Sequence, residues 1–471
     1  MNTDELLEIL SNQTIQNKLT EYTGIKKLVA EKVFGGITLG YSDSSNLPPQ
    51  ILKSIDILHN LYIQLTYYKE KYTTFDYNLI NNLFHDLSLS LIFGNDVFDE
   101  NQEKYGNLIN DLKNIGAKSY EGKAVDIGVI YCPDYYSFKQ LKQLNIDIIE
   151  LTEKKAIKEL FDNEKPFLRL IDNESFAIII DSTFNVTALA RKKKSEKSIN
   201  YIIEKQFTTY VTNKTHNELL DIYIKKIESL YEAIKDDERL EKIKGLYFEM
   251  TKDINNRPNY LYFSLKMGKI NIYTKKDFVL TYFNGDWKLK PYNLINGVLA
   301  NYLFEKNLHT LVFDNDDEES KIKIFNNLMD SIEFLSETLK RLSLSSTSTI
   351  FLINWESEFF KLINQNNENS PPMYLKAISS VDDTKQLNIK DIDYYSIKAI
   401  SSVDGAVLLD PRLNILDFGA TVNMTGSPDY QKTFGTGTKA ARYASRNCLA
   451  IKISEDGDIY FFQQEELLAK I

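Results

Sequence analysis

Hydrophobic side chains recur at helical spacing in the first quarter of the chain. An amphipathic helix places apolar residues three or four positions apart, so that they share one face. The positions that show this spacing are Ile51, Ile55, Ile57, Leu58, Leu61 and Leu65. A denser group, Leu83, Leu87, Leu89, Leu91 and Ile92, indicates a more buried segment. We therefore expect residues 1–125 to be mainly helical.

Short apolar runs replace this spacing after residue 125. The run VDIGVIYC (125–132) is followed by Pro133 and predicts a buried strand. The stretch ESFAIIIDSTFNVTALARKK (174–193) predicts two strands joined by a turn near Asp181–Asn185. The basic tract Arg191–Lys194 ends this stretch and has two interpretations, a solvated strand exit or an anion site.

Helical and hairpin patterns alternate between residues 215 and 313. Residues 215–250 predict a helix with charge pairs such as Glu238 and Lys242. The stretch DFVLTYFNGDWKLKP (277–291) predicts a hairpin, because Asn284-Gly285 favours the positive φ angles of a tight turn. Trp287 beside this turn either packs in a core or anchors a partner. We expect residues 126–313 to form an α+β module of unknown role.

The final third of the chain alternates helices and strands. A helical face over residues 321–343 consists of Phe325, Leu328, Met329, Ile332, Leu335, Leu339 and Leu342. Strands are expected at 349–356, 406–410, 415–423 and as a pair within 449–462, and helical stretches at 387–400 and about 438–447. This order predicts an α/β domain with a mixed sheet over residues 321–471. The acidic run DNDDEES (314–320) before it is a linker or helix start, or alternatively a metal loop, although its spacing does not fit an EF-hand.

Composition narrows the class of protein. The net charge of -10 and pI of about 5.2 argue against general affinity for a nucleic-acid polymer. Two cysteines, Cys132 and Cys448, exclude a disulfide framework and make a usual zinc site a poor interpretation. The sequence has neither a signal-peptide pattern nor an apolar run of membrane length, so we expect a cytoplasmic protein without a membrane partner.

Two features of the final third carry chemistry. Asp404-Gly405-Ala406 places a carboxylate at the start of a strand, where it can hold a divalent metal or accept a proton from a ribose hydroxyl. The stretch Gly435-Thr436-Gly437-Thr438-Lys439 opens a helix, and helix starts favour phosphates because their amides are unpaired. Each feature alone also fits an ordinary turn, and Arg442 and Arg446 one helical turn apart also fit a solvated face.

Together these features resemble the diadenylate cyclase (DAC) family over about 150 residues, one third of the chain. The matching positions are Asp404-Gly405-Ala406, Gly435-Thr436, Ala440-Ala441, Ser445 and the turn residues Ser454-Glu455. The resemblance implies an adenine-nucleotide site formed by Asp404, Gly405, Ala406, the segment 435–439, Ser454 and Glu455. The sequence departs from the family where an Arg-His-Arg motif is expected, since Gly437-Thr438-Lys439 stands there. Lysine does not replace arginine at a bidentate phosphate contact.

Three functions follow from this resemblance. The first is a sensor that binds ATP or a cyclic (di)nucleotide, which the altered loop favours. The second is an active cyclase that condenses two ATP into cyclic di-AMP, with catalytic Asp404 holding Mg²⁺ or Mn²⁺ and two domains meeting in a homo-oligomer. The third is a structural or partner-binding protein without a ligand. The heptapeptide KAISSVD also occurs twice, at 376–382 and 398–404, and has no physical account.

Overall fold

The computed structural model describes most of the chain and groups it into two compact units. It describes residues 8–9, 12–24, 28–33, 36–41, 57–72, 76–94, 100–163, 166–194, 197–234, 241, 244–245, 251–254, 257–276, 278–313, 318–345, 347–354, 363–364, 387–428 and 435–471. The first unit contains residues 1–42, 53–214 and 253–293, and the second contains 43–52, 215–252 and 294–471. Each unit is built around its own mixed sheet.

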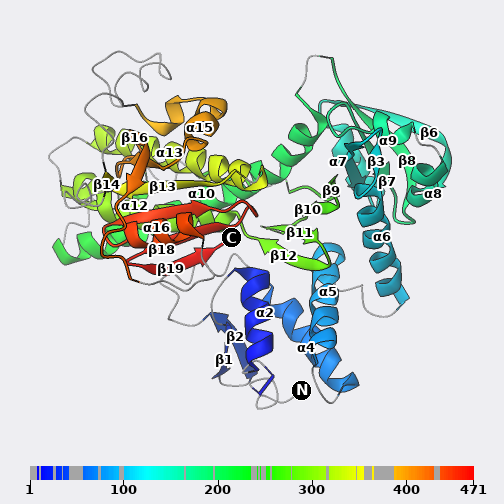
Figure 1. Ribbon diagram of the computed structural model, residues 1–471, viewed down its shortest axis with the longest axis horizontal. Helices are drawn as coiled ribbons and strands as arrows, with labels where there is room; N and C mark the ends of the chain where they lie inside the picture. The colour runs from blue at the N-terminus through cyan, green and yellow to red at the C-terminus, as the bar shows by residue number, and fades with distance from the viewer. Residues whose placement is uncertain are drawn as a thin grey trace. The chain divides into compact units, whose positions relative to one another are not determined.

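The first unit holds an eight-stranded sheet with helices before and between its strands (Figure 1). Its helices are α2 (Gln13–Thr23), α4 (Leu58–Lys71), α5 (Tyr77–Phe93), α6 (Glu100–Gly116), α7 (Tyr135–Lys142), α8 (Ile157–Asn163), α9 (Phe167–Leu170) and the first part of α10 (Ile199–Ile234). Its main sheet contains β5 (Asp126–Tyr131), β6 (Ile146–Ala156), β7 (Phe176–Ile180), β8 (Asn185–Lys192), β9 (Leu261–Lys266), β10 (Lys269–Tyr273), β11 (Val279–Phe283) and β12 (Asp286–Lys290). Two small ribbons pair β1 (Leu28–Val33) with β2 (Gly36–Tyr41) and β3 (Ser119–Tyr120) with β4 (Lys123–Ala124).

The second unit holds a seven-stranded sheet. Its strands are β13 (Thr349–Asn354), β14 (Ile363–Asn364), β15 (Ala406–Leu409), β16 (Ile415–Val422), β17 (Cys448–Ile453), β18 (Ile459–Gln463) and β19 (Glu466–Lys470). Its helices are α12 (Asn293–Phe313), α13 (Glu318–Leu344), the short η3 (Ile389–Asp391), α15 (Tyr394–Ser401) and α16 (Thr436–Ala444), joined by the second part of α10.

The two sheets share one topology. The first runs β6-β8-β7-β5-β9-β10-β11 before its extra edge strand β12, and the second runs β14-β16-β15-β13-β17-β18-β19. In both, the central strand is parallel to one neighbour, and every other pair of adjacent strands is antiparallel. A helix also follows the matching hairpins, α10 after β7–β8 and α16 after β15–β16. The chain therefore contains the same strand arrangement twice, which the sequence did not reveal.

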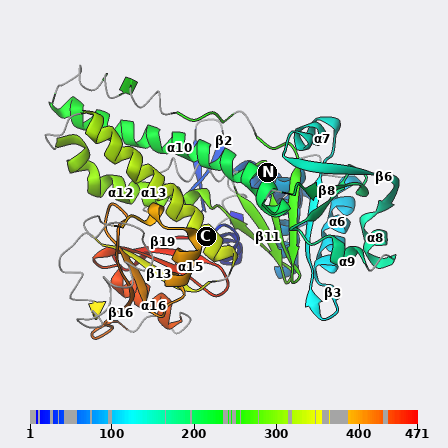
Figure 2. The same cartoon turned by 90° about the horizontal axis from the view of Figure 1, so that it is seen from above.

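The central strands of the second sheet are buried on both sides, because helices cover both faces of the sheet. Side chains of a strand alternate between faces. Ile350, Leu352, Ala406 and Leu408 pack with Ala441 of α16 in one cluster. The intervening Phe351, Ile353, Val407 and Leu409 are also buried and face the side contacted by α13 and α15. Figure 2 shows α13 and α16 on opposite sides of this sheet.

Most elements expected from the sequence are confirmed. The mixed α/β class is correct, and β5, the β7–β8 hairpin, α13, β13 and the β15–β16 pair lie where their patterns predicted. The tight turn also holds, since Asn284 and Gly285 have φ angles of 52° and 90°. Trp287 is 5% exposed and donates a hydrogen bond to His85 Nδ1 at 3.0 Å, so it packs in the first unit.

Several expectations fall differently or outside the described residues. The compact units do not follow the three regions expected, because α12 and the second part of α10 belong with α13: Tyr223, Phe304 and Phe325 stack together there. The first KAISSVD copy, the Glu238–Lys242 pair and residues 314–317 lie outside the described residues.

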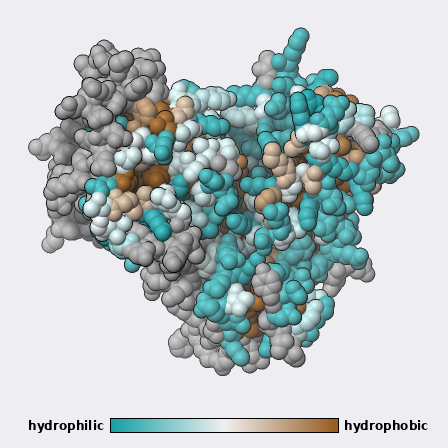
Figure 3. Space-filling view, in the orientation of Figure 1, coloured by the Kyte–Doolittle hydropathy of each residue, from teal (hydrophilic) through white to brown (hydrophobic). Residues whose placement is uncertain are grey.

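Figure 3 shows mainly hydrophilic side chains on the visible face of the first unit. Among the described helices none has the length and apolarity that a membrane crossing requires.

Candidate functional site

One edge of the second sheet collects most of the residues singled out by the sequence. Ile350 of β13 pairs with Ala406 of β15 on one side and with Lys452 of β17 on the other. Two residues beyond this row, at the same edge, stand Ser348, Asp404 and Ser454, because β13 and β15 begin there and β17 ends there. Adjacent strands lie about 4.8 Å apart, so the row from Ala406 to Lys452 spans about 10 Å.

Gly405 is required by a close approach of two backbones. Its φ of 113° lies in the region that favours glycine, and a Cβ there would lie 2.6 Å from the carbonyl oxygen of Gly419 and 2.9 Å from that of Ala420. Gly419 itself has a φ of 71°. The exposed Asp404 is therefore held at the strand start by a backbone geometry that only glycine allows.

The segment 435–439 begins α16, as its pattern suggested. Gly435 is the residue before the helix, with no side-chain cap, and the amide of Lys439 donates to its carbonyl at 3.1 Å. Among the described residues, no acceptor is present for the amides of Thr436, Gly437 and Thr438. Unpaired amides at a helix start attract anions, which the helix dipole also favours.

Lys452 reaches this helix start from the sheet below. A Cβ on Gly437 would lie 3.1 Å from both Cε and Nζ of Lys452, so the lysine head occupies the place beside the first helical turn. Lys452 is 7% exposed and donates a hydrogen bond to Ser348 Oγ at 2.7 Å. Burial lowers the pKa of Lys452, which nearby Glu455 partly opposes. Sequence reasoning missed this residue, because a single lysine inside a strand pattern gives no signal of its neighbours.

The arginines at the end of α16 and just after it are directed away from the helix start. Arg442 Nε donates to the carbonyl of Glu465 at 2.7 Å, and Arg446 forms an ion pair with the Glu465 carboxylate while its guanidinium lies over the Tyr443 ring. Both arginines thus bind the β18–β19 turn at the far end of the helix. Lys439 is half-buried, and no ion pair joins it to a described residue.

The turn after β17 is fixed by its own hydrogen bonds. Ser454 donates its amide to the carbonyl of Asp458 at 2.9 Å, and Ser454 Oγ accepts the amide of Asp458 at 3.1 Å. Gly457 contacts α13, because a Cβ there would lie 2.5 Å from the carbonyl oxygen of Ser343. Glu455 is exposed at the tip. The turn therefore joins the candidate site to the end of α13.

A metal ion at this edge would need a bound phosphate compound to supply part of its coordination. Within the described residues no three His, Cys, Asp or Glu side chains converge on one point. Asp404 could therefore offer such an ion only one carboxylate, and the other ligands would have to be phosphate oxygens and water. Mg²⁺ is often bound in this way, through one or two carboxylates and substrate phosphates.

The matching position of the first unit is closed by protein atoms. There the amides of Ile199 and Asn200, at the start of α10, donate to the carbonyls of Glu174 and Asn173 at 2.8 and 3.2 Å. The Asn173 side chain fills the space over Gly128, where a Cβ would lie 2.2 Å from Asn173 Oδ1. The strand opposite Gly128 offers Ser264, a neutral residue.

Hydrogen bonds of the Asn173 side-chain amide complete this closure. Asn173 donates to Asp126 Oδ1 at 3.0 Å and accepts from Tyr262 at 2.6 Å. The nearby basic tract forms a strand exit, since Arg191 pairs with Asp147 at 2.8 Å and Lys193 donates to Asn145 at 2.8 Å. These contacts fit the strand-exit interpretation of the tract.

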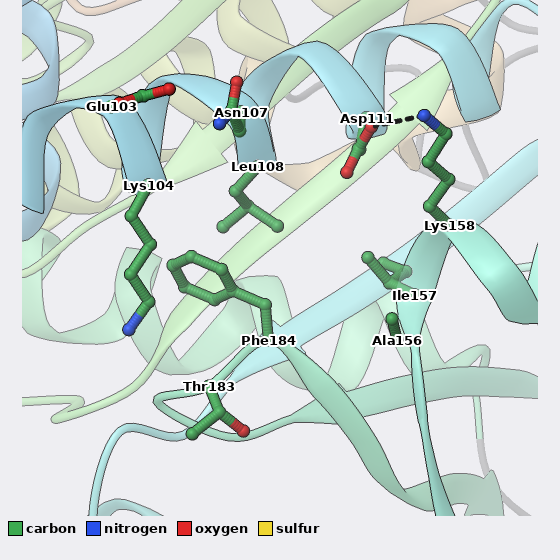
Figure 4. Close-up of a pocket in the computed structure, with 10 residues that line it drawn as sticks. All are labelled: Glu103, Lys104, Asn107, Leu108, Asp111, Ala156, Ile157, Lys158, Thr183 and Phe184. Carbon is green, nitrogen blue, oxygen red and sulfur yellow. Dashed lines mark ion pairs between the residues drawn. The ribbon is translucent and has the colours of Figure 1, made fainter.

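The first unit also contains a cavity of about 430 Å³ away from this position. Residues from α6, the β6–α8 junction and the β7–β8 turn line it (Figure 4). Three of its charged groups already have partners: Asp111 lies 3.9 Å from Lys158, and Lys104 donates to the carbonyl of Ser182 at 2.8 Å while lying over the Phe184 ring. We assign no chemistry to this cavity.

Comparisons with known proteins give only distant structural likenesses. No protein-family model matches the chain, and no curated protein matches it. A crystal structure of a double mutant of DacA from Staphylococcus aureus matches 33% of this chain and 90% of its own, at 16% identity and a TM-score of 0.21. A structure described as a hypothetical membrane spanning protein from Bacillus cereus matches 38% and 93%, at 15% identity and a TM-score of 0.23. Because both scores are low, function must be inferred from the residues themselves.

Proposed function

We propose that the second unit binds an adenine nucleotide through its phosphates and acts as a nucleotide sensor. The observation that carries this proposal is the shared edge of the sheet: Asp404 lies there, and so do the amides at the start of α16, which find no acceptor among the described residues. The glycines at both places have physical reasons, since Gly405 allows two backbones to meet and Gly437 leaves room for Lys452. A phosphate fits the amides, and Asp404 fits a ribose hydroxyl or a phosphate-bound cation.

The charges around this edge favour binding over catalysis. Phosphoryl transfer requires cations placed where charge develops in the transition state. Arg442 and Arg446 are directed to Glu465, and Gly437 and Thr438 offer no charge. The remaining cations are Lys439 in the segment 435–439 and Lys452 in β17. Neither can form the bidentate contact of an arginine.

A route from the site to the rest of the second unit passes through the turn after β17. Gly457 lies against Ser343 of α13, and Ser348 precedes β13 directly after that helix. Further along α13, Glu333 accepts hydrogen bonds from Lys252 and pairs with His216 of α10. Nucleotide binding at the edge is therefore expected to change the packing of α13, which is the element that would report occupancy.

Active cyclase chemistry remains the second candidate, because the Asp404-Gly405 geometry is intact. Calorimetry of the full chain with ATP and with cyclic di-AMP tests the proposal, and incubation with ATP and Mn²⁺ tests the alternative. Binding without product supports a sensor. Formation of cyclic di-AMP that is lost in Asp404→Asn replaces it with a cyclase. If neither ATP nor cyclic di-AMP binds, both the sensor and the cyclase are contradicted, and a structural or partner-binding protein is left.

A further inference from the structure

Lys452 is a buried cation that forms no ion pair with the described residues, although Glu455 lies near enough to favour its charged form. Lys452 is 7% exposed, and among the described residues its ammonium group hydrogen-bonds to the neutral Ser348 hydroxyl. Within the described part of the chain, no carboxylate lies within 4.0 Å of its ammonium group. An ammonium carries three donors, so two remain for another acceptor. Buried charges in proteins are normally paired, and the unpaired state is costly.

The position of this charge makes it more unusual. Its Nζ lies beside the first turn of α16, where a Cβ on Gly437 would be 3.1 Å away. A helix start carries a partial positive charge, so a cation there is repelled rather than stabilised. The lysine and the helix start therefore face the same space with the same sign. An anion in that space would satisfy both.

The first unit provides an internal comparison. Its sheet has the same strand order and directions, and α10 occupies the place of α16. There the first helix amides are bonded to the carbonyls of Glu174 and Asn173, and the matching strand position is Ser264. The same fold thus bonds its helix-start amides to protein carbonyls where the matching strand residue is a serine. Where that residue is a lysine, the amides have no acceptor among the described residues.

We propose that Lys452 is the charged phosphate contact of this site, reaching from the sheet into the space that a side chain at position 437 would otherwise fill. This inference rests on the proposed function. It assigns the phosphate charge to one buried lysine on β17 and the phosphate hydrogen bonds to the amides of Gly437 and Thr438. Gly437 is then a glycine because the lysine head needs the room.

Lys452→Met tests this assignment, since methionine keeps much of the length and removes the charge. ATP and pyrophosphate binding to the full chain is measured by calorimetry, and thermal stability is measured without ligand. Loss of a charged hydrogen bond predicts binding about 10- to 100-fold weaker. Removal of an unpaired buried charge predicts an unchanged or higher Tm. A lysine that merely supports the fold through Ser348 predicts the opposite, a lower Tm with unchanged binding.

Two further variants complete the experiment. Lys398→Met removes the same charge from α15 on the other side of the sheet and is expected to leave both quantities unchanged. The double variant Gly437→Arg with Lys452→Ala clears the space of the lysine head, moves the cation from the strand to the helix and is expected to recover most of the lost affinity. Equal binding by wild type and Lys452→Met overturns this inference while the proposed function stands. Absence of nucleotide binding by the wild-type chain overturns both.

Discussion

Replacing Gly405 with alanine tests the backbone geometry that holds Asp404. An added Cβ would lie 2.5 Å from the carbonyl carbon of Gly419 and 2.6 Å from its oxygen, at a φ of 113° that alanine rarely adopts. Strained backbone costs about 1–3 kcal/mol, and overlap in a packed region costs about as much again. The second unit should therefore lose about 4 kcal/mol of stability, which is a large share of the total for a domain.

Hydrogen exchange measures this loss within one chain. The amides of β13, β15 and β17 should exchange faster in Gly405→Ala, and those of the first unit should not change, so the first unit serves as the internal reference. Gly426→Ala is the matched control, because Gly426 has a φ of 80° but no described residue lies within 4 Å of its Cβ position. The control should cost only about 1–2 kcal/mol. If both variants behave alike, the close approach of Gly405 and Gly419 is not real.

The remaining predictions concern stoichiometry and two buried contacts. Calorimetry with ATP should give one site per chain, since the first unit closes the matching position, and two sites would refute that closure. Burial alone would raise the pKa of Glu333, but hydrogen bonds from His216 and Lys252 lower it. Its stabilisation is therefore present above the ordinary carboxyl pKa and is lost as pH falls through the lower folded value. Glu333→Gln should cost about 1–3 kcal/mol near pH 7 and converge with wild type in acid denaturation, whereas a constant difference at every pH would exclude the ion pair. Gly128→Ala should destabilise the first unit by about 2–4 kcal/mol, because its Cβ would lie 2.2 Å from Asn173 Oδ1; unchanged exchange in β5 would contradict this.

Local elements could be predicted from the sequence because their signals are local. The helical face of α13 repeats over seven apolar positions, and all of them are buried. The Asn284-Gly285 turn and the strand pair around Asp181–Asn185 follow from turn chemistry. The α/β class of the final third follows from the order of such elements.

Tertiary relations could not be predicted in the same way. The matching topology of the two sheets depends on strand pairing across more than one hundred residues, and the two halves share no sequence pattern that signals it. The compact units also divide α10, because the first part of that helix packs in one core and Tyr223 packs with Phe304 in another. Neither periodicity nor composition contains such information.

The candidate site was partly visible in the sequence. The Asp404-Gly405 pair and the glycines at 435 and 437 were visible as motifs. The strand register places Asp404 and Lys452 at one edge, and the contact of Gly437 with Lys452 brings the helix start there. Lys452 was not visible, because its place depends on strand pairing with Ile350 and on the absence of a side chain at Gly437, both of which are tertiary features. Arg442 and Arg446 gained their partner from Glu465, a residue in the turn before an edge strand that sequence reasoning did not identify.

The central claim is that a phosphate binds between the start of α16 and the sheet beneath it. A crystal structure of the full chain grown with ATP and Mn²⁺ tests this directly. The account predicts a phosphate within hydrogen-bond distance of the Gly437 and Thr438 amides and of Lys452 Nζ, with the ribose side of the nucleotide toward Asp404. A nucleotide bound elsewhere, or protein side chains occupying those amides, would contradict it.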